Sequence, residues 1–189
     1  MVASANPQTA ILAAREQRAR RTQQFCDRLR LPTIVLTVNA PGPDKNAPWV
    51  ARVMAQGTAA IRDTLDECGL ILCDAASYRS AAGPEWRGAV QAQLSPAALK
   101  RLTVGIEESH RLGRLFDIDV FSHTLTPLGR AALGLAPRRC LVCDRPAHEC
   151  VRSRRHRLSD IQAKIATLVG GDGDSGVVSS YRSVIDTYR

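Results

Sequence analysis

Two aspartates stand one residue apart in the segment HRLGRLFDIDV, residues 110–120. Successive side chains of a β-strand point to opposite faces, so Asp117 and Asp119 would share one face while apolar residues line the other. Two carboxylates at this spacing repel each other and need a cation or strong hydrogen-bond donors nearby. Magnesium binds one or two carboxylates together with substrate phosphates, so the pair suits phosphoryl or nucleotidyl transfer. The alternative is an edge strand whose acids face water or pair with Arg111 and Arg114.

A second group of chemically capable residues is Cys140, Cys143, Cys150 and His156, which fall within 17 residues. The first two cysteines have the spacing of a zinc knuckle, in which a turn directs both sulfurs at one ion. If residues 146–157 form one helix, Cys150 and His156 lie roughly 120° apart around its axis and cannot share an ion without a break. The alternative is buried free cysteines that pack a helix whose other face is rich in arginine.

The charge of the chain is strongly positive and comes almost entirely from arginine. There are 26 basic and 18 acidic residues, giving +8, and lysine occurs only at Lys45, Lys100 and Lys164. The arginine fork suits phosphate and carboxylate, although a genome rich in arginine codons would give the same composition. Candidate partners are nucleic acid, a membrane surface, a polyphosphorylated small molecule or an acidic protein. Scarce aromatics and the lack of RNP or zinc-finger patterns argue against nucleic acid.

Length and cysteine usage indicate one domain in a reducing compartment. At 189 residues and 44% apolar content, the chain is long enough for one substantial core. No run of ~20 apolar residues is present, which predicts no membrane-spanning helix. The N-terminal segment lacks the order of a signal peptide, so we expect a cytoplasmic protein. Six cysteines without such a signal indicate reduced thiols or a metal site rather than disulfides.

Helical and strand patterns alternate along the chain. Helices are expected at 8–30, 48–69, 95–110 and 158–169, and strands at 33–39, 70–78 and around the two aspartates. The segment SAAGPEWRG at 80–88 is expected to be a loop near a ligand, and residues 122–137 favour either a short hairpin or a helix. The predicted fold is α+β: one compact domain with a central mixed sheet and flanking helices.

The helix expected at 8–30 carries six arginines against Glu16 and Asp27. This pattern predicts a surface helix with a solvated, positively charged face.

Four motifs, in order along the chain, resemble one known family. They are LPTIVLTVNAPGPDK at 31–45, Gly83-Pro84-Glu85, ESHRLGRLFDIDV at 108–120, and PRRCLVC at 137–143 followed by Cys150 and His156. The family is the apo-citrate lyase phosphoribosyl-dephospho-CoA transferases, also called citrate lyase holo-acyl-carrier-protein synthases. The resemblance covers about residues 15–168. It divides the chain into a variable N-terminal segment at 1–14, a transferase domain at 15–169 and a flexible tail at 170–189.

The resemblance implies a transfer reaction. A serine hydroxyl of the acyl carrier subunit (gamma subunit) of citrate lyase attacks the 2′-(5″-triphosphoribosyl)-3′-dephospho-CoA precursor. Pyrophosphate leaves, and a phosphodiester-linked prosthetic group remains on the serine. Both the triphosphate and the acidity of acyl carrier proteins suit an arginine-rich chain.

Residue roles follow as hypotheses within that resemblance. Asp117 and Asp119 would bind magnesium that bridges the triphosphate, and His110 would accept the serine proton, with Glu107 or Glu108 as rivals. The candidate phosphate-binding residues are Arg111, Arg114, Arg138 and Arg139.

The acid pattern also resembles the acid strand of nucleotidyltransferases, which suggests a nucleotidyltransferase-like fold. Those enzymes have Gly-Ser or Gly-Gly at the start of the preceding helix, where this chain offers only Gly105 and Gly113. Two other functions stay open: a nucleotidyltransferase acting on another hydroxyl, and a non-enzymatic arginine-rich nucleic-acid-binding or assembly factor. Nucleic-acid binding would weaken steeply with salt and would need neither magnesium nor a carrier protein.

Overall fold

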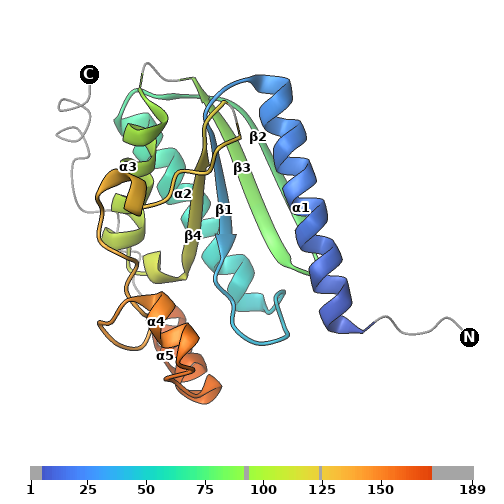
Figure 1. Ribbon diagram of the computed structural model, residues 1–189, viewed down its shortest axis with the longest axis vertical. Coiled ribbons are helices and arrows are strands. Elements are labelled where there is room, and N and C mark those ends of the chain that lie inside the picture. The colour runs from blue at the N-terminus through green and yellow to red at the C-terminus, as the bar shows by residue number, and fades with distance from the viewer. Residues whose placement is uncertain (1–5, 92–93, 124, 172–189) are drawn as a thin grey trace, which may run out of the picture.

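The computed structural model describes residues 6–91, 94–123 and 125–171, and these form an antiparallel sheet flanked by helices (Figure 1). The order of the four strands in the described residues is β2-β3-β1-β4. The elements are α1 (Pro7–Leu29), β1 (Thr33–Val38), α2 (Pro48–Glu67), β2 (Ile71–Ser80), β3 (Gly83–Gln91), α3 (Pro96–Ser109), β4 (Phe116–Phe121), α4 (Ala147–Arg152) and α5 (Leu158–Gly170), with short 3₁₀ turns at Gly113–Leu115 and Ala131–Leu133.

The α+β class, the single domain and the flanking helices are confirmed. Three details differ from the sequence predictions. The sheet is antiparallel in every described pairing, not mixed, because β2 and β3 form a hairpin and β1 lies between β3 and β4. The segment GPEWRG is the start of β3 rather than a loop: Gly83, at φ 93°, closes the hairpin turn and the residues after it are strand. After β4 the described residues turn back in one isolated antiparallel bridge, Phe121 to Pro127, and the chain then runs on through the 3₁₀ turn Ala131–Leu133 without an α-helix.

One face of the sheet is apolar and packs against α2 and α3. Alternate residues of β1 and β4, such as Leu36 and Phe116, are fully buried on this face. Burial of this apolar surface supplies most of the driving force for folding. It also fixes the register of β4, since a slip of one residue would turn the two aspartates into the core.

The opposite face of the sheet lies under α1 (Figure 1). This face carries charged residues, among them Glu85, which pairs with Arg18 and Arg21 of α1. Cross-strand pairing places Glu85, Thr37 and Asp117 in one row over β3, β1 and β4. The next row holds Arg87, Val35 and Asp119. Adjacent strands are about 4.8 Å apart, so Glu85 lies roughly 10 Å from Asp117 along its row.

Glu85 anchors α1 to this polar face. Its buried carboxylate accepts hydrogen bonds from Arg18 Nε (2.6 Å) and Arg21 Nε (3.0 Å), and it also pairs with the buried Arg87. Tyr78 lies beneath the Arg21 and Arg87 guanidinium groups, about 5 Å from ring centroid to carbon. The predicted solvated face of α1 is therefore corrected in part, because two of its arginines are used to neutralise Glu85.

The structure gives little information on the predicted boundaries of the N-terminal segment and the C-terminal tail. Helix α1 begins at Pro7, so it includes residues on both sides of the predicted boundary at 14 and 15, and that boundary stays a prediction. The predicted tail at 170–189 lies almost wholly outside the described residues. No helix in the described part of the chain is long and apolar enough to cross a membrane.

We expect Glu85→Gln to destabilise the fold by about 3–5 kcal/mol, because it leaves buried guanidinium groups without their counter-charge. Urea denaturation followed by circular dichroism measures the change. Asp74→Asn is the matched control, since Asp74 forms only an exposed ion pair with Arg28 and should cost less than about 1 kcal/mol. A Glu85→Gln variant as stable as the control would contradict the anchoring role.

Candidate active site on the two sides of strand β4

Asp117 and Asp119 line a hollow of about 560 Å³ between α1 and the sheet. The strand alternates as predicted, with the two aspartates exposed and Ile118 buried between them on the other face. Arg15 and Arg18 reach the same hollow from α1. The hollow therefore places two carboxylates opposite two guanidinium groups.

The two aspartates differ in their surroundings. Asp117 accepts a hydrogen bond from Arg138 Nη1 at 3.1 Å and a longer one from the Thr37 hydroxyl at 3.4 Å. Asp119 has no such guanidinium partner among the hydrogen bonds of the described residues. Partial desolvation in the hollow, followed by the charge of Asp117, raises the pKa of Asp119, although its side chain reaches solvent. A cation placed between the two carboxylates would relieve both effects.

A second hollow, of about 660 Å³, lies beside the end of α3 and is strongly cationic. Its lining includes the predicted site residues on the HRLGR segment and on the segment before Cys140. The charged and titratable residues are Glu107, Glu108, His110, Arg111, Arg114, Arg130, Arg138, Arg139 and Lys164. The structure thus brings His110 and the four predicted phosphate-binding arginines together, but around a different hollow from the two aspartates.

His110 is packed against the chain rather than presented to the aspartates. Its ring lies 4.8 Å from the Phe116 ring, and Phe116 is on the apolar face of β4. The Leu112 N–H donates to His110 Nδ1 at 3.0 Å, so a neutral ring in this arrangement carries its proton on Nε2. Burial, and then the nearby Arg111 charge, lowers the pKa of His110 below its ordinary value. The role of base would require the Leu112 hydrogen bond to open.

Gly113 explains the abrupt turn from α3 into β4. A Cβ at this position would lie 2.3 Å from the Glu107 carbonyl oxygen, which is backbone and cannot move aside cheaply. Close contact of the two backbones lets the chain reverse within the 3₁₀ turn Gly113–Leu115. This reversal puts His110 and Arg111 on one side of β4 and the aspartates on the other.

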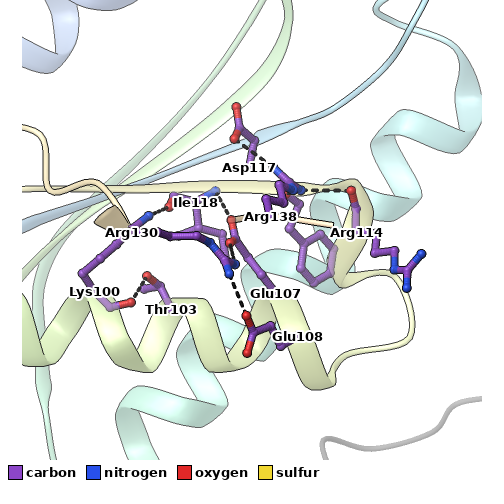
Figure 2. Close-up of polar contacts among 10 residues, drawn as sticks. Lys100, Thr103, Glu107, Glu108, Arg114, Asp117, Ile118, Arg130 and Arg138 are labelled. Carbon is purple, nitrogen blue, oxygen red and sulfur yellow. Dashed lines mark hydrogen bonds and ion pairs between the residues drawn. The ribbon is translucent and has the colours of Figure 1, made fainter. Parts of the chain in front are cut away.

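Figure 2 shows charged side chains that form hydrogen bonds with backbone groups on the outer edge of β4. Ile118 donates its N–H to the Glu107 carboxylate at 3.0 Å and accepts at its carbonyl from Lys100 Nζ. Arg130 pairs with both Glu107 and Glu108. The two glutamates proposed as rival bases therefore already have partners, and Glu107 is buried as a cap on the strand edge.

Arg138 connects the two hollows around this edge (Figure 2). Its guanidinium contacts Asp117 on one side and donates to the carbonyl oxygens of Arg114 (2.9 Å) and Phe116. Arg111 donates to the Leu168 carbonyl of α5. These contacts hold Arg138 and Arg111 in place around the second hollow.

The cysteine and histidine group is assembled into one cluster. One potential ligand atom from each of Cys140, Cys143, Cys150 and His156 lies within 4.8 Å of every other, which makes a possible metal site. Helix α4 ends at Arg152, so the single helix over 146–157 that would have separated Cys150 from His156 does not form.

Sequence reasoning missed Arg15 and Arg18 as site residues. Their helix was recognised, but their partners were not, because β3 was taken for a loop and Glu85 was not seen as a strand residue facing α1. One signal was available: Glu85 stands in a run that ends in the apolar residues Ala89 and Val90, which is compatible with a strand.

Comparisons with known proteins agree on one family. A family model described as apo-citrate lyase phosphoribosyl-dephospho-CoA transferase matches residues 8–171. A protein of that name from Citrobacter koseri is 35% identical over 170 residues, covering 89% of this chain and 91% of its own length. One from Escherichia coli O1:K1 is 35% identical over 159 residues, covering 84% and 86%.

We expect Asp119→Asn to raise the free energy of unfolding at pH 7. A carboxyl whose folded pKa is raised loses stability as pH rises through that pKa, and the neutral amide removes this loss. The gain should shrink as pH falls toward the ordinary aspartate value of about 3.9. Asp63→Asn, exposed on α2, is the control and should change little. Carboxyl NMR should also show the pKa of Asp119 falling in Asp117→Asn; an unchanged pKa would argue against coupling of the two acids.

Proposed function

The chain belongs to the family of apo-citrate lyase phosphoribosyl-dephospho-CoA transferases, and we propose that it attaches this prosthetic group to a serine of the citrate lyase acyl carrier subunit. The donor is 2′-(5″-triphosphoribosyl)-3′-dephospho-CoA. The serine oxygen forms a bond to the α-phosphorus of the triphosphate, and the bond from that phosphorus to the pyrophosphate oxygen breaks. The serine proton is released, and the product is a phosphodiester.

The observation that carries the proposal is the hollow in which Asp117 and Asp119 face Arg15 and Arg18. A triphosphate is polyanionic and needs both fixed positive charge and a means to spread charge on the departing pyrophosphate. Arg15 supplies positive charge from α1 beside Arg18, whose Nε is held by Glu85, and Arg138 supplies it from the edge of β4. We place the triphosphate here.

The two aspartates fit a magnesium ion by their chemistry. Both offer hard carboxylate oxygens on one exposed strand face, and the charge of Asp117 contributes to raising the pKa of Asp119. When bound, magnesium would neutralise phosphate charge and favour departure of pyrophosphate. Arg138, already on Asp117, would orient that carboxylate toward the ion.

The second hollow suits the other phosphates of the donor. The dephospho-CoA part carries a pyrophosphate of its own, separated from the triphosphate by the two linked riboses. Arg111, Arg114 and Arg139, together with Lys164, form a cationic lining on the far side of β4. We assign the CoA pyrophosphate to this lining. His110, with Nε2 as a donor, joins it as a binding residue, which departs from the base role suggested by the sequence.

The net charge of +8 supports the choice of protein acceptor. Acyl carrier proteins are generally acidic, so complementary charge would steer the carrier to the chain and raise the association rate. Raised salt should therefore increase the KM for the carrier more than it lowers kcat.

Asp117→Asn and Asp119→Asn should each lower the rate of pyrophosphate release by about 100-fold or more, because each removes a carboxylate that would hold the magnesium ion beside the departing group. The assay supplies donor, apo carrier and magnesium, and omission of donor or carrier should abolish release. Asp74→Asn, on the far edge of the sheet, is the control and should keep the parent rate. A folded variant of either site aspartate within a few-fold of the parent would remove that residue from the reaction.

His110→Gln separates a binding role from a base role. Glutamine keeps an amide N–H donor but cannot act as the base, so a binding role predicts kcat and the KM for the donor substrate within a few-fold of the parent. His110→Ala, which has no donor, should raise that KM by about tenfold or more. His148→Gln, exposed on α4, is the matched control. If His110 is the base, the parent profile should instead have an acid limb below pH 6.5, the ordinary histidine pKa, because the pKa of His110 is lowered. Disappearance of that limb in His110→Gln, with a large loss of kcat, would restore the base role.

A further inference from the structure

Three thiols and one imidazole converge in a cluster formed by Cys140, Cys143, Cys150 and His156. Cys143 Sγ lies 3.6 Å from Cys150 Sγ and 3.4 Å from His156 Nε2. Tetrahedral zinc, with bonds of about 2.3 Å to sulfur and 2.0 Å to nitrogen, would hold two sulfurs roughly 3.8 Å apart and a sulfur and a nitrogen roughly 3.6 Å apart. These two separations match the tetrahedral edges within 0.2 Å, and all four ligand atoms lie within 4.8 Å of one another. A disulfide would need about 2.05 Å.

The local backbone is built to bring the ligands together. Residues 138–147 form a tight hairpin, in which Cys140 N–H donates to the Arg145 carbonyl at 2.8 Å and Ala147 N–H donates to the Arg138 carbonyl at 2.7 Å. This turn presents Cys140 and Cys143 to one side. Helix α4 then presents Cys150 and ends after one and a half turns.

The break after α4 returns the chain to the cluster. Arg154 adopts a left-handed conformation with φ 46°, which a non-glycine residue rarely does without a compensating contact. The reversal lets His156 reach Cys143. A metal bond from His156 would supply that compensation.

The charge around the cluster also favours a metal. Three thiolates with one Zn²⁺ carry a net charge of −1, and residues 138–157 hold seven arginines against Asp144 and Glu149. Arg114 donates to the Cys140 carbonyl at 2.9 Å, within this same neighbourhood. The −1 of the zinc cluster would offset one of these five excess positive charges, whereas three neutral thiols would offset none.

We propose that Cys140, Cys143, Cys150 and His156 bind one zinc ion as a closed structural site that fixes the segment carrying Arg138 and Arg139 against the edge of β4. Cys140 and Cys150 are buried and Cys143 and His156 are half-buried, so the four protein ligands leave no open position for a substrate. Sulfur ligands select zinc over magnesium, so this ion is distinct from the one proposed at Asp117 and Asp119. Arg138 lies two residues before the first ligand, and its carbonyl closes the hairpin.

The test is metal analysis of the untagged full chain purified under reducing conditions. Mass spectrometry of the metal content should give about one zinc per chain in the parent. Cys143→Ser and Cys150→Ser should lose it, and Cys73→Ser, an exposed cysteine on β2, should retain it. Parent protein stripped by a chelator and reconstituted with cobalt(II) should show the absorption of a tetrahedral thiolate site. Amide exchange over residues 138–157 should become faster on stripping and slow again on reconstitution.

Trace zinc in the parent together with no cobalt absorption after reconstitution would overturn the proposal, as would a Cys143–Cys150 disulfide in freshly purified protein. The stripped parent keeps the test decisive even if a serine variant fails to fold. None of these readouts depends on transfer activity, so the zinc site stands or falls separately from the proposed function.

Discussion

The free edge of β4 is the constraint on which the rest of the site depends. An edge strand in a sheet leaves outward N–H and carbonyl groups that must find partners when they are covered. Here Glu107 and Lys100 satisfy Ile118, and Arg138 satisfies Phe116. Because these caps are charged side chains, each needs its own counter-charge, which Arg130 provides for Glu107 and Asp117 for Arg138. Satisfying the strand edge therefore also gathers arginine around it.

The two faces of β4 have different roles: one packs in the core and the other carries the two aspartates. Phe116 and Ile118 are buried in the core on one face of β4. Because side chains alternate along a strand, Asp117 and Asp119 therefore point toward α1. The buried Glu85 holds α1 there through Arg18, which also lines the hollow of the aspartates. Cationic groups thus lie on both sides of a thin strand. In the proposed function, these two groups of cations bind the two separate phosphate groups of the donor.

Much of this could be predicted from the sequence where the signal is local. The β-branched run at Thr33–Val38 and the alternation around Asp117 and Asp119 correctly gave strands, and the shared face of the two acids followed from strand periodicity. Gly83 and Pro84 were misleading, because the same residues that mark a loop also close a hairpin. The separation of His110 from the acids depends on close contact at Gly113, and the approach of His156 to Cys143 depends on a strained Arg154. Neither feature has a residue pattern from which it could be recognised.

Intact-mass measurement of the acyl carrier subunit of citrate lyase tests the central claim most directly. The apo subunit is incubated with this chain, magnesium and 2′-(5″-triphosphoribosyl)-3′-dephospho-CoA. The account predicts a gain equal to one phosphoribosyl-dephospho-CoA group, located on a serine and absent when the chain is omitted. An unchanged carrier mass, with protein that is folded and metal-loaded, would contradict it.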